Sequence, residues 1–261
     1  MVKPIITSLS NPLVKQARAL RGHKARAESG LFLVEGIHHV GAAVEAGWDI
    51  DSILYAPDML TSSFARDLIS RLDTGLQQPV SASVMESLAD KENPQGIVAI
   101  VHRKQKSLNE IESVRCGAAA VSPQDPGNVG TILRTLDAVG ADALFLLDGG
   151  VDPYHPTSIR ASMGAIFWKP FVQCAFDEFA DWARRKKIQL VGTSAHAGDN
   201  YRAFRPEQNF ILLLGSEQKG LSSDHLNVCD AAISLPMRGR TSSLNLAVAA
   251  GILLYQFIQP E

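Results

Sequence analysis

The chain has 261 residues, of which 46% are hydrophobic, so it is long enough to bury the core of one large or two modest domains. A formal net charge of −2 excludes a uniformly basic coat, so any affinity for RNA must come from local patches. Cys116, Cys174 and Cys229 are widely spaced and form no CxxC pair, and the histidines form no HExxH pattern. No stretch is long and apolar enough to cross a bilayer. We expect a reduced, cytoplasmic protein with no metal and no membrane association.

The first 27 residues are locally basic. They carry six Lys and Arg residues and no acidic residue. Asn11-Pro12 is typical of a helix start, and the residues that follow place Val14 and Ala17 on an apolar stripe. A row of outward cations is usually only solvated, but it can also follow a phosphate backbone. We predict that this segment contacts RNA through Lys15, Arg18, Arg21, Lys24 and Arg26.

The rest of the first hundred residues alternates strand and helix patterns. Strands are predicted at 30–36, 50–55 and 96–101, a short extended piece at 79–80, and helices at 37–47, 64–72 and 84–89. The start is βαβ-like, which predicts a small α/β domain. The polar residues 104–109 are typical of a linker. We place a first domain at 1–103, a linker at 104–113 and a second domain at 114–261.

The second domain also alternates strands and helices. A strand at 118–122 leads through a turn into a helix with Asn128 near its cap, an apolar face from Val129 to Val139, and Arg134 pointing elsewhere. Strands follow at 143–147, 170–174 and 188–193, with helices at 157–167 and 176–187. This alternation with short connections predicts a mostly parallel sheet covered on both faces.

Two strand-like runs near the C-terminus each end in a turn-rich loop. Phe210–Leu214 stops at GSEQKG, and the run 231–235 stops at PMRGR, after which Ser242–Asn245 opens an apolar helix. Glycine-rich loops between buried strands suit a neutral ligand bound by main-chain groups. Neither a GxxxxGKS phosphate loop nor a GxGxxG turn is present in the sequence. On spacing alone, two ordinary strand-ending turns explain the pattern equally well.

These segments resemble a known family. LLLGSEQKGLS and ISLPMRGRTSSLNLAVAAGILLY are similar to the last two signature motifs of the SpoU/TrmH RNA ribose methyltransferases of the SPOUT class, and Asp125–Asp142 is similar to the first. The stretch SLSNPLVKQARALRGHKARAESGLFLVEGIHHV resembles the family's substrate-binding domain, which is similar to certain RNA-binding ribosomal proteins. RASMGA at 160–165 resembles an element that lies near the family's active site or dimer interface.

The resemblance implies a C-terminal trefoil knot, in place of the ordinary doubly wound sheet that connection rules favour. It also implies a homodimer, and S-adenosylmethionine held in the knot, largely by backbone groups, at Thr193, Ser194, Ala195, Leu214, Gly215, Leu235 and Leu244. At Gly215 we expect that a side chain would push the backbone away from this ligand.

The resemblance further implies that Arg134 acts on the ribose hydroxyl. A guanidinium stays protonated in proteins, so literal base action is demanding. Arg134 could instead hold the target phosphate, with proton removal by that phosphate or by a transiently neutral Arg. Asn128, Glu217, Ser243 and Asn245 match the family's polar positions and are expected to orient Arg134 and shape the loops. The family often has Val-Ser after SLN, whereas Leu246-Ala247 follow here.

We therefore expect methyl transfer from S-adenosylmethionine to a ribose 2′-hydroxyl in RNA. Ribosomal RNA is favoured, because little sequence follows the last helix and some tRNA-specific relatives carry a long extension there. A tRNA ribose or base methyltransferase, or a non-catalytic RNA-binding assembly factor, remain alternatives. The target nucleotide, and a housekeeping or antibiotic-resistance role, stay open.

Overall fold

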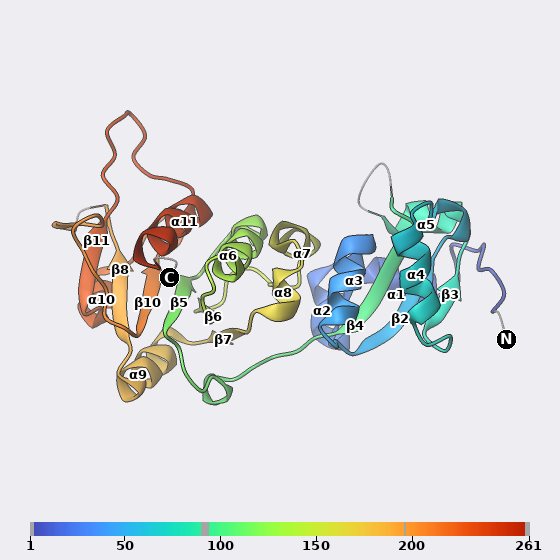
Figure 1. Cartoon of the computed structure of the whole chain (residues 1–261), viewed down its shortest axis with the longest axis horizontal. Coiled ribbons are helices and arrows are strands. Elements are labelled where there is room, and N and C mark those ends of the chain that lie inside the picture. Colours follow the sequence, from blue (N-terminus) through green and yellow to red (C-terminus); the bar gives the residue numbers. More distant parts are fainter. Residues whose placement is uncertain (1–2, 90–93, 196, 259–261) are drawn as a thin grey trace. The chain divides into compact units, whose positions relative to one another are not determined.

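The structure is a computed structural model that describes residues 3–89, 94–195 and 197–258. The chain forms two compact units (Figure 1). The first unit comprises Met1–Lys104 together with Tyr154–Phe167, and the second comprises Gln105–Pro153 together with Trp168–Glu261. The chain therefore crosses between the units three times, whereas the sequence suggested one crossing at a linker.

The first unit has a four-stranded sheet in the order β1-β4-β2-β3. The strands are β1 (Leu31–Glu35), β2 (Ile50–Tyr55), β3 (Gln77–Pro79) and β4 (Ile97–His102). β4 is antiparallel to both β1 and β2, and β2 is parallel to β3. The predicted βαβ-like start is therefore split: α3 (Ile37–Glu45) joins β1 to β2, but β4 lies between them.

Short polar side chains cap three helices of the first unit, α1 (Pro12–Ala19), α4 (Ser63–Arg71) and α5 (Ala82–Leu88). Helix α2 (His23–Ser29) follows Gly22 without a side-chain cap, and η1 (Pro57–Met59) is a 3₁₀ turn. The Asn11 side chain accepts from the Leu13 N–H, as the Asn-Pro pattern predicts. Val14 and Ala17 are fully buried in one core with Val84 and Met85 of α5. The predicted apolar stripe of α1 is thus confirmed.

In the segment Tyr154–Phe167, residues 157–167 were predicted to be one helix within the second domain. It forms α7 (Pro156–Ser162) and the start of α8 (Ala165–Trp168), separated by Met163 and Gly164 with φ of 50° and 92°. The prediction of one continuous helix is therefore wrong. A Cβ on Gly164 would lie 3.1 Å from the Ala42 Cβ, so the break occurs where the segment packs closely on α3.

An aromatic cluster holds this segment in the first unit. The Tyr154 ring lies 4.5 Å from the Phe32 ring, and Trp48 lies 5.3 Å from Phe167 and donates from Nε1 to its carbonyl. The Tyr154 hydroxyl donates to the Lys104 carbonyl and accepts from the Lys104 N–H. Tyr154 is only 1% exposed, so its ring is part of the core of the first unit.

We expect Tyr154→Ala to lower the free energy of unfolding by about 3 kcal/mol or more, because it empties a large buried site. Tyr154→Phe should cost only about 1 kcal/mol, since it keeps the ring and removes the hydroxyl's hydrogen bonds. Urea unfolding of both variants and the wild type measures the difference. Equal, small losses in both variants would contradict a core role for the ring.

The second unit has a seven-stranded sheet in the order β7-β6-β5-β10-β8-β11-β9, and every pairing in it is parallel. The strands are β5 (Cys116–Val121), β6 (Ala143–Leu147), β7 (Phe171–Cys174), β8 (Gln189–Thr193), β9 (Asp199–Asn200), β10 (Phe210–Leu214) and β11 (Ala231–Ser234). β5, β6 and β10 are buried along their whole length, so helices or loops cover both faces. The predicted α/β fold with a mostly parallel sheet is confirmed.

Helices cover the two faces of this sheet. They are α6 (Pro126–Ala138), α9 (Phe176–Lys186), α10 (Ser223–Val228) and α11 (Leu246–Phe257), with the 3₁₀ turn η2 (Leu108–Glu110). Phe179 and Trp182 of α9 pack on Phe145 of β6. Within the predicted linker, Leu108 is buried in the same core. The short helix α10 was not predicted, because its sequence has no apolar periodicity.

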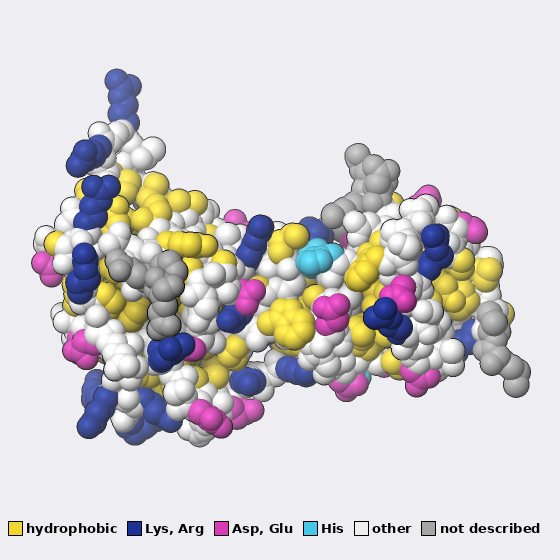
Figure 2. Space-filling view, in the orientation of Figure 1, with side chains coloured by type: hydrophobic (Ala, Val, Ile, Leu, Met, Phe, Trp, Pro, Cys, Tyr) yellow, Lys and Arg dark blue, Asp and Glu magenta, His cyan; other side chains and the backbone are white. Residues whose placement is uncertain are grey.

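The helix α11 keeps an apolar face at the surface. It carries no charged residue, and hydrophobic side chains show over it in Figure 2. Across the described ranges, no helix has the length and hydropathy needed to traverse a lipid bilayer. The trefoil knot implied by the family resemblance stays a prediction.

Candidate active site

The centre of the site is the side chain of Glu217, in the loop after β10. Its Oε1 accepts from Asn128 Nδ2 at 2.9 Å and from the Asp125 N–H at 3.2 Å, and its Oε2 accepts from the Gln124 N–H at 3.0 Å. Asn128 is 5% exposed and lies in the first turn of α6, whose N-cap is Asp125. The loop after β10 is thereby fixed to the loop that enters α6.

Asn245 extends the same network to α11. Its Nδ2 donates to Asn128 Oδ1 at 2.9 Å, and its own Oδ1 accepts from the N–H groups of Ala247 and Val248 at the helix N-terminus. Asn128, Glu217 and Asn245, predicted from three separate motifs, therefore form one hydrogen-bonded chain, which we call the motif network. Ser243 is exposed and makes no hydrogen bond within the described part of the chain.

The motif network sets the ionisation of Glu217. Burial alone would raise the pKa of this carboxyl group, but the hydrogen bonds from Asn128 and from the backbone of Gln124 and Asp125 outweigh it and lower the pKa below its usual value. The carboxylate is thus ionised at neutral pH and acts as an acceptor only.

The residues predicted to bind the cofactor gather at one edge of the sheet. Because β10, β8 and β11 are parallel neighbours, their last residues meet there, with Leu213 beside Gly192 and Thr193 beside Ile233. Thr193–Ala195, Leu214–Gly215 and Leu235 follow these strand ends, and Leu244 precedes α11. We call this the C-terminal edge of the sheet, and it is where open parallel sheets bind ligands.

Gly215 is required by the loop itself. A Cβ there would lie 2.1 Å from the Gly220 carbonyl carbon and 2.3 Å from the Leu221 nitrogen. The loop closes on itself at this point through a Gly220 N–H bond to the Ser216 carbonyl. Close backbone packing within the loop therefore requires a glycine at this position. The expectation that a side chain there would also push the backbone away from a ligand stays a prediction.

Arg134 is exposed on α6, away from the buried face formed by Val129, Ile132, Leu133 and Leu136, as predicted. Within the described ranges its guanidinium makes no hydrogen bond or ion pair. Asn128 and Glu217 were expected to orient Arg134, but among the described residues neither side chain is hydrogen-bonded to it. Asn128 and Glu217 instead bind each other, and Asn128 also binds Asn245.

The comparisons with known proteins agree with this geometry. Residues 117–255 match the SpoU rRNA methylase family, and residues 11–99 match the MRM3-like substrate binding domain. The chain belongs to the SpoU rRNA methylase family. The family prediction made from the three motifs is confirmed.

Individual relatives cover nearly the whole chain. A 23S rRNA (uridine(2479)-2′-O)-methyltransferase of Streptomyces viridochromogenes is 35% identical over 95% of this chain and 90% of its own. The 23S rRNA (guanosine(2553)-2′-O)-methyltransferase RlmP of Bacillus subtilis is 32% identical over 96% and 97%. The crystal structure of an AdoMet-bound rRNA methyltransferase from Sinorhizobium meliloti is 33% identical, with a TM-score of 0.87 over 97% and 96% of the two chains.

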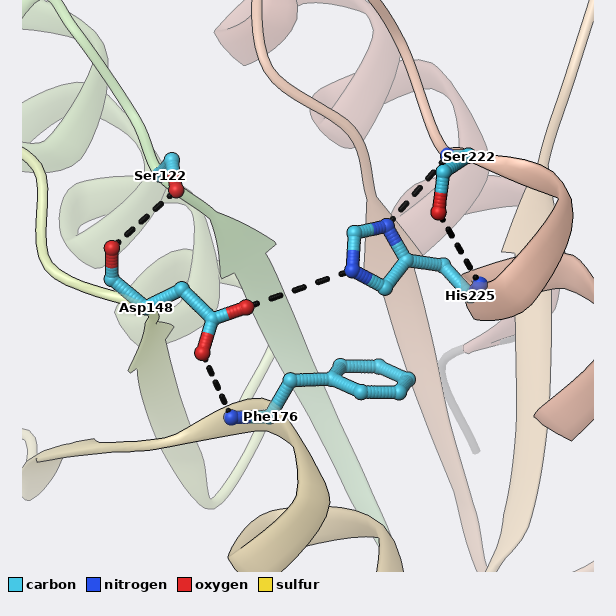
Figure 3. Close-up of polar contacts among 5 residues, drawn as sticks. All are labelled: Ser122, Asp148, Phe176, Ser222 and His225. Atoms are coloured by element: carbon cyan, nitrogen blue, oxygen red, sulfur yellow. Dashed lines mark hydrogen bonds and ion pairs between the residues drawn. The ribbon is translucent and has the colours of Figure 1, made fainter.

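A second polar cluster of this SpoU protein, missed from the sequence, fastens α10 (Figure 3). Asp148 follows β6 with φ of 54°, and its carboxylate accepts from the Phe176 N–H at 2.8 Å and lies 3.9 Å from His225 Nε2. His225 Nδ1 accepts from the Ser222 N–H, and the Ser122 hydroxyl donates to the Asp148 carbonyl. The turn Asp148-Gly149-Gly150 was the available signal, since Asp and Gly favour left-handed conformations.

Four of the five predicted RNA-binding cations have intramolecular partners. Arg26 is 1% exposed, and its guanidinium donates to the carbonyls of Leu20 and Arg21, so the prediction that it contacts RNA is wrong. Arg18 donates to Ser87 Oγ and Arg21 to the Leu88 carbonyl, which ties α1 to the end of α5. Lys15 and Lys24 are exposed, and the Lys24 ammonium lies 3.8 Å from the Glu28 carboxylate. The basic run at the N-terminus is therefore partly structural.

The cysteines are poor nucleophiles in this fold. Burial, with a contribution from Asp142, raises the pKa of the Cys116 thiol to about 12. Burial likewise raises the pKa of Cys174 to about 12 and that of Cys229 to about 11. All three are free thiols, and the described residues contain no group of three His, Cys, Asp or Glu side chains placed to hold a metal ion.

We expect Glu217→Gln to destabilise the protein at pH 7, because Gln cannot accept from Asn128 and both backbone N–H groups through two oxygens. The folded-state pKa of Glu217 is lowered. Its contribution is therefore complete above the pKa of an unfolded glutamate, about 4.3, and is lost as the pH falls through the folded-state pKa. Urea unfolding across this range should show the gap between wild type and variant shrinking as the pH falls.

The matched control is Glu207→Gln, because the Glu207 carboxylate is exposed and makes no hydrogen bond among the described residues. This variant should track the wild type at every pH. A difference between Glu217→Gln and wild type that stays constant with pH would contradict an ionised Glu217 at the centre of the motif network.

Proposed function

We propose that this protein transfers a methyl group from S-adenosylmethionine to the 2′-hydroxyl of a ribose in ribosomal RNA. The observation that carries the proposal is the motif network, in which Glu217, Asn128 and Asn245 join the three motif segments beside the C-terminal edge of the sheet. Relatives of 35% and 32% identity over nearly the whole chain are named as 23S rRNA 2′-O-methyltransferases. With ribosomal RNA as substrate, the enzyme acts in the cytoplasm.

The cofactor would lie among the strand-ending segments at Thr193–Ala195, Leu214–Gly215, Leu235 and Leu244. These positions carry no charged side chain, and the side chain of Leu244 is 39% exposed, so an apolar surface is open to a ligand. The Thr193 hydroxyl already donates to the Leu213 carbonyl within the protein. When bound, S-adenosylmethionine supplies an electrophilic methyl group on a sulfonium.

The chain's own residues position the ribose and handle its proton. As the ribose oxygen forms its bond to the methyl carbon, the hydroxyl proton must leave. The free guanidinium of Arg134 holds the phosphate of the target nucleotide, and that phosphate, or a transiently neutral Arg134, takes the proton. Glu217, Asn128 and Asn245 keep the surrounding loops rigid, and Ser243 lies at the entrance to α11, where it can contact RNA or cofactor.

The first unit supplies further contacts to the RNA. Lys15 and Lys24 are exposed there, and Arg18 and Arg21 are half-buried. We assign RNA binding to the predicted first domain, residues 1–103, and catalysis to the predicted second domain, residues 114–261. It accords with the match of residues 11–99 to a substrate binding domain.

We expect Arg134→Ala to leave the fold and cofactor binding intact and to reduce methyl transfer by on the order of 10² or more, because it removes a positioning and proton-handling group. Arg134→Lys should also fail, since an ammonium cannot reproduce the planar guanidinium. Incorporation of labelled methyl groups into ribosomal RNA lacking the modification measures transfer, and calorimetry measures cofactor binding. Near-normal transfer by a folded Arg134→Ala variant would overturn this role.

We further infer that two copies associate through α11. Val248, Ile252 and Tyr255 of α11 are 49%, 38% and 61% exposed. Their spacing of four and three residues places them on one side of the helix. Few apolar stripes of this kind remain exposed in a monomer, and a two-fold partner would cover it with the same stripe.

Val248→Asp combined with Ile252→Asp should convert the dimer into a monomer, because each copy would bring two charges into an apolar interface. Light scattering after size-exclusion chromatography gives the mass. Phe64→Ser is the control, since Phe64 is 52% exposed on the first unit and its replacement should leave the dimer unchanged. A wild-type protein that is monomeric at micromolar concentration would refute the inference.

A further inference from the structure

The second unit carries an arginine-rich surface that the motifs do not account for. It consists of Arg202 and Arg205, in the segment after β9, and Arg238 and Arg240, in the loop between β11 and α11. All four residues are exposed. Figure 2 shows Lys and Arg side chains in a row that starts at the tip of that loop. We call these four residues the arginine edge.

Sheet pairing brings the two segments together. β9 is parallel to β11, with Ile233 beside Asp199 and Ser234 beside Asn200, so both segments leave the sheet at its C-terminal edge. The Tyr201 N–H donates to the Ser234 carbonyl at 3.2 Å, and the Ser234 hydroxyl donates to the Asp199 carbonyl. The two arginine-bearing segments thus leave the sheet side by side, although 35 positions separate Asp199 from Ser234.

The guanidinium groups of the arginine edge are not neutralised by the protein. Arg205 donates to the carbonyls of Arg202 and Phe204, and Arg202 donates to the Tyr201 hydroxyl. Arg238 and Arg240 make no side-chain hydrogen bond, and none of the four forms an ion pair within the described residues. Residues 235–245 contain no acidic residue.

Part of this surface has a fixed backbone. Phe204 lies between Arg202 and Arg205, and its ring packs 5.8 Å from that of Phe257 at the end of α11. The Ala203 and Phe204 N–H groups both donate to the Asn200 carbonyl. Arg202 and Arg205 are therefore presented from an ordered turn, so less freedom is lost when they bind a ligand.

We propose that the arginine edge binds the sugar-phosphate backbone of the substrate RNA beside the target nucleotide. This inference rests on the proposed function, which puts the cofactor at the same edge of the sheet. A ribose that reaches the methyl group there must bring its flanking phosphates across this edge. Arginine is the side chain best suited to phosphates, because its planar donors bind them bidentately.

The arginine edge supplies cations for RNA binding that the N-terminal basic run does not. The net charge of the chain is −2, and Arg18, Arg21 and Arg26 of the N-terminal basic run have intramolecular hydrogen bonds. Each phosphate that a substrate-binding surface neutralises adds affinity and makes binding more sensitive to salt. The four arginines supply this charge on the catalytic unit itself.

The test uses two double variants of the full-length protein, Arg202→Gln with Arg205→Gln, and Arg238→Gln with Arg240→Gln. The control is Arg185→Gln with Lys187→Gln. It removes two exposed cations at the end of α9 that have no side-chain partner among the described residues; they lie next to the start of β8 and thus at the opposite edge of the same sheet. Anisotropy of a labelled single-stranded RNA oligonucleotide gives affinity at several salt concentrations. Calorimetry gives the affinity for S-adenosylmethionine.

Each edge variant should weaken RNA binding by about tenfold and flatten the slope of log K against log salt by roughly 0.7 for each phosphate that is no longer neutralised. The control and the cofactor affinity of the Arg202–Arg205 variant should not change. Equal weakening in the edge and control variants, or no weakening in either, would overturn the proposal. Loss of RNA affinity only in the Arg238–Arg240 variant, together with loss of cofactor affinity, would also overturn it.

The same proteins separate this inference from the proposed function. If the wild type transfers methyl groups to ribosomal RNA and the edge variants bind RNA and turn over normally, the arginine edge fails alone. If the wild type transfers no methyl group but the edge variants lose RNA affinity, the edge stands as an RNA surface and the proposed reaction fails.

Discussion

The carboxylate of Glu217 holds together three segments that are distant in the sequence. It binds Asn128 across 89 positions, and Asn128 binds Asn245 across 117 positions. Every donor in this chain is a side-chain amide or a backbone N–H, and a partly buried acceptor left without them would be costly. The network therefore fixes the positions of the loop after β10, the start of α6 and the start of α11 relative to one another. The hydrogen bond from the Gly220 N–H to the Ser216 carbonyl further orders the loop that carries Glu217.

This constraint explains how a site can form from loops. Parallel strands bring their ends to one edge, but the segments that follow β8, β10 and β11 have few regular hydrogen bonds of their own. The motif network fixes the loop after β10 at the C-terminal edge of the sheet. The Asp148–His225 pair fastens α10, the helix that follows this loop. Arg134 and the arginine edge carry no ion pair around these fixed groups within the described residues, as expected of cations that are kept for a substrate.

The segment Tyr154–Phe167 has a different role in the architecture. It leaves the second unit after β6, enters the aromatic cluster of the first unit, and returns before β7. Its first residue, Tyr154, is hydrogen-bonded to Lys104, and its last residue, Phe167, is hydrogen-bonded to Trp48. A truncation at residue 103 would therefore expose a buried aromatic surface, because the first unit needs this segment to complete its core.

The sequence by itself determined the family, the α/β class, most strand and helix positions, and the polar residues of the motif network. Strand residues that are buried on both faces appear as apolar runs, and the motif residues are adjacent to glycine-rich turns, so these signals are local. Only the tertiary structure decided which distant groups meet. Arg26 carries the same charge as Lys15 in the sequence, but its burial against backbone carbonyls removes it from the surface. The insertion of β4 between β1 and β2 and the transfer of Tyr154–Phe167 to the first unit depend on long-range packing and strand pairing. The pairing of β9 with β11, which brings the two arginine-bearing segments to one edge of the sheet, depends on them too. Local periodicity carries no record of these contacts, because their free energy comes from partners far away along the chain.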